Sequence, residues 1–233
     1  PQVTLINDFV AVAYNIVLEK NKDLLTLQSG EVMENAPIAI IGAGTGLGKA
    51  FAIPQGDSYE VFPTEGGHTN FAPDSQIQME LLEHLLSQGK VDTEAIVSGT
   101  GIVTIFKFLK EHKFPDQIAE DILTQADPAK AIATEAGKEN PNFLCQKTMK
   151  IFIEAYGAAV GDMAVSFLPF GGIYIAGGIA AQNIELMQEG KFMKAFQSKA
   201  RIKPMLLAKI PIHIVCNTLS GLIGAVQYAI NKM

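Results

Sequence analysis

Glycines and carboxylates cluster at three places in the first hundred residues, next to short apolar runs. Asn7-Asp8 follows one such run, Gly42 to Gly48 lies between two of them, and Glu65 to His68 forms a turn of its own. Glycine lets a phosphate approach backbone N–H groups closely, whereas carboxylates and amides hold the paired hydroxyls of a sugar. Together the three clusters predict one site, at strand ends, for a polyhydroxylated substrate and a phosphate.

The composition indicates a folded protein with a large core. Of its 233 residues, 48% are hydrophobic and 18% are charged, which suits one large domain or two small ones. The net charge of -6, without a dense basic block, argues against nucleic-acid binding. The longest apolar stretch, 163–179, contains proline and glycines, so we expect no membrane helix. Cys145 and Cys216 stand far apart outside any zinc pattern, so we expect reduced thiols and a cytoplasmic protein.

The apolar periodicity predicts an α/β chain in which strands and helices alternate. Strands are expected at 3–6, 38–41, 50–53, 172–176 and 210–215. Helices are expected at 9–18, 76–88, 102–112, 115–124, 142–167, from about 180 onward, and at 220–231. Pro115-Asp116 would open the fourth helix, because proline suits a first helical turn. The run 3–6 is of the β type and would need neighbouring strands to satisfy its backbone.

Each cluster also has a plainer explanation. The run Gly42 to Gly48 fails the P-loop pattern, because Ala50 follows Lys49 and a strand rather than a helix comes next. It also fails the dinucleotide spacing, which leaves a hairpin loop with Thr45 at its tip. From the residues alone, phosphate contact and a merely tight turn both stay open.

The polar residues are equally ambiguous when taken singly. Asp8 could simply cap the following helix, although capping and catalysis are compatible because the positive helix end favours an ionised carboxylate. His68 alone would more often be an ordinary loop histidine, but Glu65, three residues earlier, strengthens the case for a functional role of both residues. Gly177-Gly178 after a buried strand could reflect close packing or a ligand site beyond the strand end. We assign no role to the other histidines and no metal-binding residues; these histidines are His84, His112 and His213.

Five short motifs occur in series along the chain. They are Leu5-Ile6-Asn7-Asp8-Phe9, Gly42-Ala43-Gly44-Thr45-Gly46-Leu47-Gly48, Glu65-Gly66-Gly67-His68, Ser98-Gly99-Thr100-Gly101 and Ile175-Ala176-Gly177-Gly178-Ile179. In order and spacing they resemble the motifs of bacterial glucokinases, ATP-dependent glucose kinases of the hexokinase-actin superfold. The chain lacks the cysteine-rich zinc motif of the related repressor and sugar-kinase group, which favours the zinc-free branch. The resemblance implies an actin-like, ribonuclease H-like large domain with a mixed sheet flanked by helices.

The resemblance also implies roles for single residues. Asp8 would be the general base that takes the proton from the 6-hydroxyl of glucose as that oxygen attacks the terminal phosphate of ATP. The sugar would be held by the family's matching positions, which are Asn7, Asp8, Glu65, His68 and Glu94. The nucleotide, carried with Mg²⁺, would meet a phosphate turn and an adenosine turn, which are Gly44, Thr45 and Gly46, and Gly177 and Gly178.

One family element is missing from the sequence. The first phosphate motif, an Asp-x-Gly-Gly-Thr run in a small N-terminal domain, does not occur. We therefore expect residues 1–233 to form the large C-terminal domain, and the isolated chain to lack glucose-dependent ATP turnover. The resemblance suggests a homodimer. A non-catalytic sugar sensor on the same fold, or a kinase for another hexose or an amino sugar, stays open, although a sensor would not need Asp8.

Overall fold

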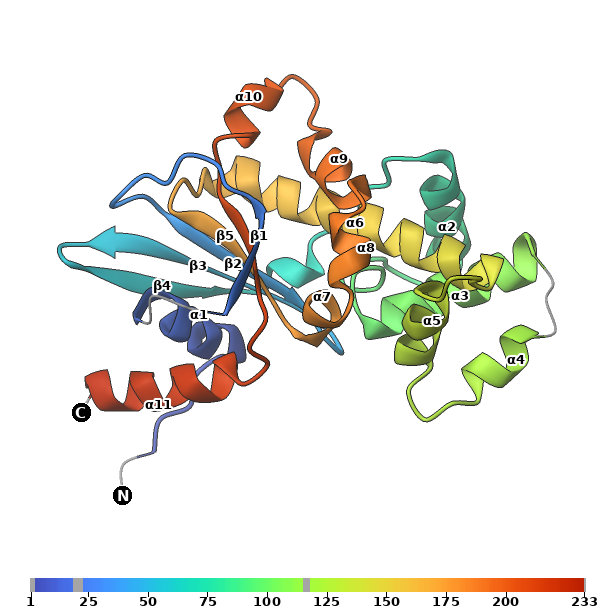
Figure 1. The fold of residues 1–233 in the computed structure, drawn as a ribbon, viewed down its shortest axis with the longest axis horizontal. Helices are drawn as coiled ribbons and strands as arrows, with labels where there is room; N and C mark the ends of the chain where they lie inside the picture. Colours follow the sequence, from blue (N-terminus) through green and yellow to red (C-terminus); the bar gives the residue numbers. More distant parts are fainter. Residues whose placement is uncertain (1–2, 19–22, 115–117, 233) are drawn as a thin grey trace.

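The computed structural model describes residues 3–18, 23–114 and 118–232, and these build one mixed β-sheet with helices on both faces (Figure 1). The strand order in the described chain is β1-β6-β5-β2-β3-β4. The strands are β1 (Leu24–Gln28), β2 (Ile38–Ala43), β3 (Leu47–Gln55), β4 (Ser58–Thr64), β5 (Gly172–Ala176) and β6 (Ile212–Val215). β2, β5 and β6 run parallel to one another, whereas β1, β3 and β4 each run antiparallel to a neighbour. This confirms the expected fold class.

The central strands are the ones that the sequence predicted. β2 is buried along its whole length, as expected for a strand that is covered on both faces. Alternate β2 residues enter two different cores: Ile38 and Ile40 pack toward α1 (Asp8–Leu18), and Ala39 and Ile41 join the larger core around α6 (Phe143–Phe167). β1 and β4 were not predicted, because these edge strands are only partly buried and their apolar pattern is weak.

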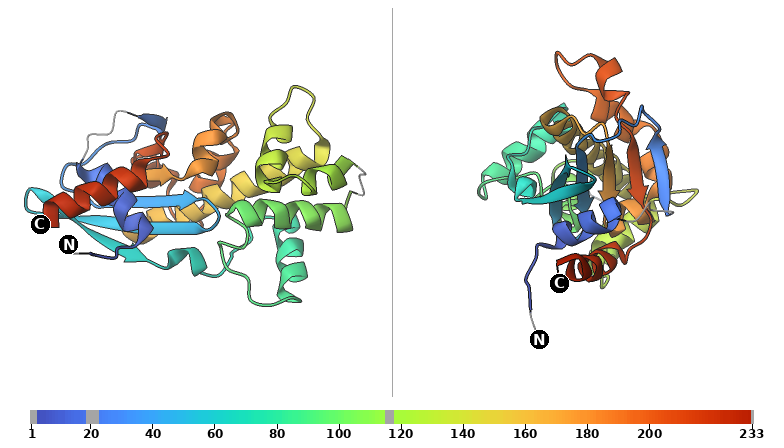
Figure 2. Two further views of the ribbon diagram at one scale, coloured as in Figure 1. Left: turned by 90° about the horizontal axis from the view of Figure 1, so that it is seen from below. Right: turned by 90° about the vertical axis from the view of Figure 1, so that its left-hand side faces the viewer.

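Helices cover the two faces unequally. On one face α1 lies beside α11 (Ser220–Lys232), and on the other α6 runs past the sheet toward a group of helices (Figures 1 and 2). The helices of that group are α2 (Gln76–Leu86), α3 (Gly99–His112), α4 (Ile118–Leu123) and α5 (Pro128–Ala136). The predicted helices at 9–18, 76–88, 102–112, 142–167 and 220–231 are confirmed. None of the helices that the structure describes has both the length and the apolar character needed to cross a bilayer.

Two helix predictions need correction. The single helix expected from residue 180 is a series of short helices, broken at Asn183 and at Gly190, whose φ of 85° is left-handed. The pieces are α7 (Gly178–Gln182), α8 (Ile184–Gln188), α9 (Lys191–Gln197) and α10 (Pro204–Leu207). The helix α5 was missed, although Asp127 caps it and Pro128 opens it, a clear start signal. The proposed opening at Pro115-Asp116 lies outside the described residues.

The strand predicted at 3–6 is wrong. These residues are irregular and pair with no strand in the described part of the chain, and the side chains of Val3 and Leu5 are 89% and 98% exposed. β-type residues alone do not make a strand, because a strand requires a neighbour that supplies hydrogen bonds and a packed face. The apolar run instead leads into α1.

The α1–α11 pair depends on a close approach of two backbones. A Cβ on Gly224 of α11 would overlap the carbonyl oxygen of Ala11 in α1. Nearby, the buried Asn15 amide donates a 2.7 Å hydrogen bond to the Ser220 hydroxyl. The two helices therefore meet through a glycine and a buried polar bond.

We expect Gly224→Ala to lower the free energy of unfolding by at least about 1–3 kcal/mol, because the added methyl overpacks a rigid backbone contact. Gly221→Ala is the matched control: its Cβ would lie 3.6 Å from Val12, an ordinary contact. Alanine also favours a helix over glycine by up to about 1 kcal/mol. Urea denaturation of both variants decides this, and equal stability would contradict the packing argument.

Candidate active site

The tip of the β2–β3 hairpin lies beyond the carboxyl ends of β2 and β5, where open α/β sheets bind ligands. The turn is closed by a 2.8 Å hydrogen bond from the Gly44 N–H to the Gly46 carbonyl. Thr45 is exposed at the tip, as predicted, and no described residue accepts a hydrogen bond from the N–H of Thr45 or Gly46. These two amides are therefore available to an anion.

Two glycines of the run serve packing instead. Gly42 and Gly48 are register partners, and the ring of Phe9 covers both. A Cβ on Gly42 would lie 2.9 Å from the Phe9 Cζ, and one on Gly48 would overlap the ring. The glycines thus let Phe9 seat the first turn of α1 on the hairpin, which brings Asp8 to this edge of the sheet.

The residue that caps α1 is Asn7. Its side-chain oxygen accepts hydrogen bonds from the N–H groups of Phe9 at 2.9 Å and Val10 at 3.3 Å. Asp8, considered above as the cap, lies in the first turn, where its exposed carboxylate accepts from the Phe9 N–H at 2.9 Å. Because Asn7 supplies the cap, most of the acceptor capacity of Asp8 remains for a ligand.

His68 is paired with a carboxylate that the sequence analysis missed. Its Nδ1 lies 2.8 Å from an Asp92 carboxylate oxygen. The hydrogen bond with Asp92, followed by the negative charge of Glu94, raises the pKa of His68. The other Asp92 oxygen accepts the Ala95 N–H at 2.8 Å, which fixes the carboxylate. Asp92 therefore orients the imidazole and leaves Nε2 to face a ligand.

Glu94 joins the sugar-type residues to the hairpin. Its Oε2 accepts a 2.7 Å hydrogen bond from the Leu47 N–H, directly after the turn. A Cβ on Gly46 would lie 2.6 Å from the same oxygen, so glycine is needed for this approach. The backbone N–H of Glu94 donates to the Gly67 carbonyl at 3.0 Å. One residue thus links the hairpin, the Glu65–His68 turn and its own loop.

Glu65 begins the turn η1 (Gly66–His68) and is exposed. No residue of the described chain donates a hydrogen bond to its carboxylate. The turn itself is anchored to β3, because the Thr64 hydroxyl accepts from the Gly66 N–H at 3.1 Å and donates to the Lys49 carbonyl at 3.0 Å. A fixed backbone therefore presents an unpaired carboxylate.

The two glycines of the Gly177-Gly178 turn differ in their surroundings. Gly177 has a φ of 89°, and a Cβ there would lie 2.6 Å from the Ala43 carbonyl oxygen, so close packing explains this glycine. Gly178, the first residue of α7, is different, because the nearest atom to its Cβ position is the Gln182 amide nitrogen at 3.6 Å. Gly178 therefore leaves space for a ligand at the end of β5.

The amino-terminal end of α3 also reaches the hairpin. The Ser98 hydroxyl caps this helix by accepting the Gly101 N–H at 3.0 Å. The Gly99 N–H donates to the Gly44 carbonyl at 2.8 Å, which holds the turn from behind. Thr100 is exposed beside it. The motif Ser98-Gly99-Thr100-Gly101 was noted in the sequence, but its contact with the hairpin was not foreseen.

The site thus has two chemically distinct parts around one hairpin. Carboxylates and an imidazole gather on the η1 and Glu94 side, where they can accept from and donate to the hydroxyls of a neutral polyol. Backbone amides at the hairpin tip can hold an anion. The predicted segments are tied to the hairpin by a hydrogen bond, by a packed side chain or, at Gly177, by close backbone packing.

Comparison with known proteins identifies the family of this chain. A family model described as glucokinase matches residues 1–232. The chain belongs to the glucokinase family. The glucokinase of Nostoc sp. (strain PCC 7120 / SAG 25.82 / UTEX 2576) is 45% identical over 97% of this chain and 70% of its own length. The prediction of a glucokinase is confirmed.

Solved structures agree on the fold. A glucokinase from an Antarctic psychrotroph superposes with a TM-score of 0.80 at 29% identity, covering 97% of this chain and 68% of its own. A ROK-family glucokinase from Streptomyces griseus, solved with glucose and AMPPNP, has a TM-score of 0.63 at 20% identity and covers 97% and 67%. The glucokinases share the sheet and the arrangement of helices described above.

We expect Asp92→Asn to lower the pKa of His68 toward the ordinary histidine value. The raised pKa depends first on the Asp92 hydrogen bond, and asparagine keeps the shape but loses the charge. NMR titration of the imidazole signals measures this. His213, whose pKa is lowered by burial in β6, is an internal control and should not move. An unchanged pKa for His68 would show that Asp92 does not control its protonation.

Proposed function

We propose that this protein transfers the terminal phosphoryl group of ATP to the 6-hydroxyl of glucose. Family membership supports a hexose kinase, and the Streptomyces griseus relative was solved with both glucose and an ATP analogue. The single observation that carries the proposal is the Glu94 to Leu47 hydrogen bond. It sets a sugar-holding carboxylate against the turn whose free amides suit a phosphate.

Glucose is held by polar side chains from the η1 turn, from the loop of Glu94 and from the start of α1. Glu65 accepts from ring hydroxyls with its unpaired carboxylate, and Glu94 does so with the oxygen that Leu47 does not use. His68 contacts a hydroxyl through Nε2 while Asp92 holds Nδ1. The amide nitrogen of Asn7 donates to the sugar, since its oxygen caps α1. A pattern of this kind rejects wrong epimers, because a misplaced hydroxyl leaves these polar groups without their hydrogen bonds.

Asp8 acts as general base at the attacking hydroxyl. Its carboxylate is exposed in the first turn of α1. A carboxylate suffices, because the phosphoryl transition state is loose and positioning matters more than base strength. As the 6-oxygen attacks the γ-phosphorus of ATP, its proton passes to the Asp8 carboxylate. The bond from the γ-phosphorus to the bridging oxygen of the β-phosphate breaks, so that glucose 6-phosphate forms and ADP leaves.

The nucleotide phosphates meet the hairpin, and the adenosine meets the β5–α7 turn. Thr45 and Gly46 donate backbone N–H groups, and Gly44 keeps the turn narrow. Gly178 lets the nucleotide lie against the backbone, with Gly177 shaping the turn. Mg²⁺ supplies charge neutralisation when bound with ATP, and we expect phosphate oxygens and water to be most of its ligands.

Residues 1–233 act as the large domain. The nucleotide-binding site is completed by the Asp-x-Gly-Gly-Thr motif, which the family carries in another domain. The chain matches 70% of the length of the Nostoc sp. glucokinase, which leaves room for such a unit in that relative. Closure of two domains would exclude water and align the reacting atoms. A homodimer is part of the same proposal, because the resemblance suggests it. A cytoplasmic location is proposed as well, since Cys145 and Cys216 form no disulfide in the described chain.

Two other functions are less well supported. A sugar sensor needs no base, yet Asp8 is exposed at the site and its helix is capped by another residue. A kinase for another hexose or an amino sugar would use the same residues, so the comparison of glucose with other hexoses as substrates separates these cases.

We expect Asp8→Asn to reduce kcat by at least ~10²-fold in the full-length protein with little effect on glucose affinity, because asparagine keeps the contact but cannot take the proton. Coupled assays and calorimetric titration with glucose measure the two effects. The control is Asp57→Asn, an exposed carboxylate at the opposite end of the β3–β4 pair, which should leave kcat unchanged. A fully active Asp8→Asn enzyme would remove Asp8 from the mechanism.

A further inference from the structure

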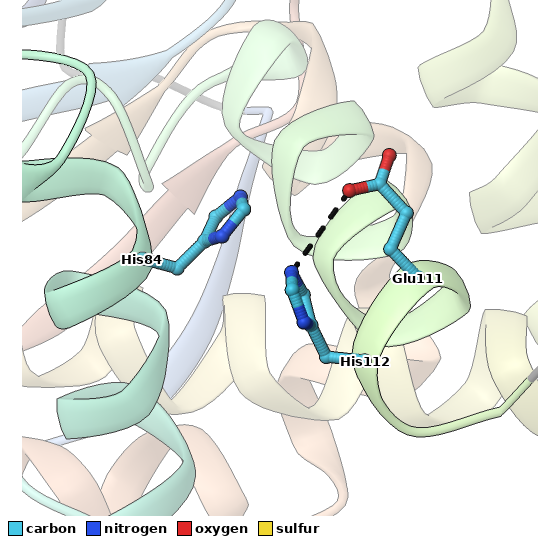
Figure 3. Close-up of side chains that lie close together, drawn as sticks. All are labelled: His84, Glu111 and His112. Atoms are coloured by element: carbon cyan, nitrogen blue, oxygen red, sulfur yellow. Dashed lines mark ion pairs between the residues drawn. The ribbon is translucent and has the colours of Figure 1, made fainter.

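The surface between α2 and α3 holds three side chains of the kinds that bind zinc. His84 comes from α2, and Glu111 and His112 come from α3, with one ligand atom of each within 4.8 Å of the others. Figure 3 shows both imidazole rings and the carboxylate turned toward the same gap between the helices. His112 Nε2 lies 4.0 Å from a Glu111 oxygen. Helix packing therefore brings together two histidines to which the sequence analysis assigned no role.

Packing fixes the directions of the two rings. The imidazoles of His84 and His112 lie 5.4 Å and 5.3 Å from the ring of Phe108, which is buried, and 4.6 Å from each other. The Gln88 amide lies 3.2 Å from His84 Nε2, within hydrogen-bond distance. Metal-binding histidines are commonly held in this way by a polar partner outside the metal shell. The rings are thus already oriented before any ion binds.

The local electrostatics favours a cation. Each histidine lies in the last turn of its helix, where the backbone carbonyls give a partial negative charge. Glu111 adds a full negative charge. Imidazole nitrogen with one carboxylate suits zinc and similar transition metals, whereas Mg²⁺ prefers oxygen ligands alone.

We propose that His84, Glu111 and His112 bind one zinc-class divalent cation, with water in the fourth position. Bond lengths near 2.0–2.2 Å place tetrahedral ligands roughly 3.4 Å apart, so the side chains must close by about 1 Å. Such movement is available, since the side chains of Glu111 and His112 are 60% and 46% exposed.

The site would clasp α2 onto α3. Leu81 of α2 and several residues of α3 belong to the same hydrophobic core, and a 2.9 Å ion pair joins Lys113, directly after α3, to Glu80 of α2. The helix α2 lies in the chain between His68 and Asp92. A bound ion that holds α2 against α3 would therefore also stabilise the segment that carries these two residues. The cluster stands at the far end of α3 from Gly99, about 20 Å along the helix axis from the hairpin. It is therefore separate from the place proposed for the nucleotide.

The test uses full-length protein without a histidine tag, treated with chelator and then titrated calorimetrically with Zn²⁺ in excess Mg²⁺. We expect saturable binding of one ion, and a melting temperature that rises with Zn²⁺. His84→Ala and His112→Ala should each weaken Zn²⁺ binding by at least ~10-fold, as loss of a ligand costs no less than loss of its outer partner. Glu111→Gln keeps the shape of this exposed side chain but removes its charge, and it should also weaken Zn²⁺ binding.

Two variants serve as matched controls. Glu83→Gln removes the carboxylate next to His84, and His213→Gln removes a histidine from the sheet; both should bind Zn²⁺ as the original protein does. Circular dichroism checks that every variant is folded, and His112→Gln replaces His112→Ala if the latter is not. The absence of saturable binding, or affinity unchanged in the His84, Glu111 and His112 variants, would overturn the proposal.

Discussion

The hydrogen bond between the Leu47 N–H and the Glu94 carboxylate is the interaction on which the site depends. Without it, the N–H group of Leu47, the first residue of β3, would lack its hydrogen-bond acceptor. The side chain of Glu94 would then no longer hold the loop of Asp92 and Glu94 to the hairpin. With it, residues that suit a sugar and amides that suit a phosphate belong to one rigid unit. A phosphoryl transfer enzyme needs this proximity more than it needs strong chemical groups.

The hairpin is held in turn by the core on both faces. From α6, the hydroxyl of the buried Tyr156 accepts a 3.1 Å hydrogen bond from the Ala43 N–H, at the last residue of β2. From the other side, Phe9 packs on Gly42 and Gly48 and carries the start of α1. Burial raises the pKa of Tyr156, so this anchor stays neutral and acts as a plain hydrogen-bond partner. The edge of the sheet that carries the candidate site is therefore held by packed residues on both faces.

Local patterns predicted the elements whose signal lies within one stretch of chain. The hairpin follows from a glycine run between apolar strands, and α2 and α6 follow from their apolar spacing. The strand at 3–6 failed because pairing depends on a neighbour that is remote in sequence. For the same reason Asp92 was missed as the partner of His68, although it stands two residues before Glu94. The packing role of Gly42 and Gly48 depends on their contact with Phe9, which is remote in sequence. The proximity of His84 and His112 likewise depends on the packing of α2 against α3.

The coupling of the sugar side to the hairpin is tested most directly by the backbone amide signals of full-length protein during a glucose titration. We expect the NMR signals of Gly46 and Leu47 to shift as glucose is added and to saturate together with the His68 imidazole signal, because Glu94 contacts the hairpin and is proposed to bind the sugar. The Asp57 amide, at the other end of β3, should stay unchanged. Hairpin amides that do not respond at saturating glucose, while His68 does, would contradict the coupling of the sugar side to the hairpin.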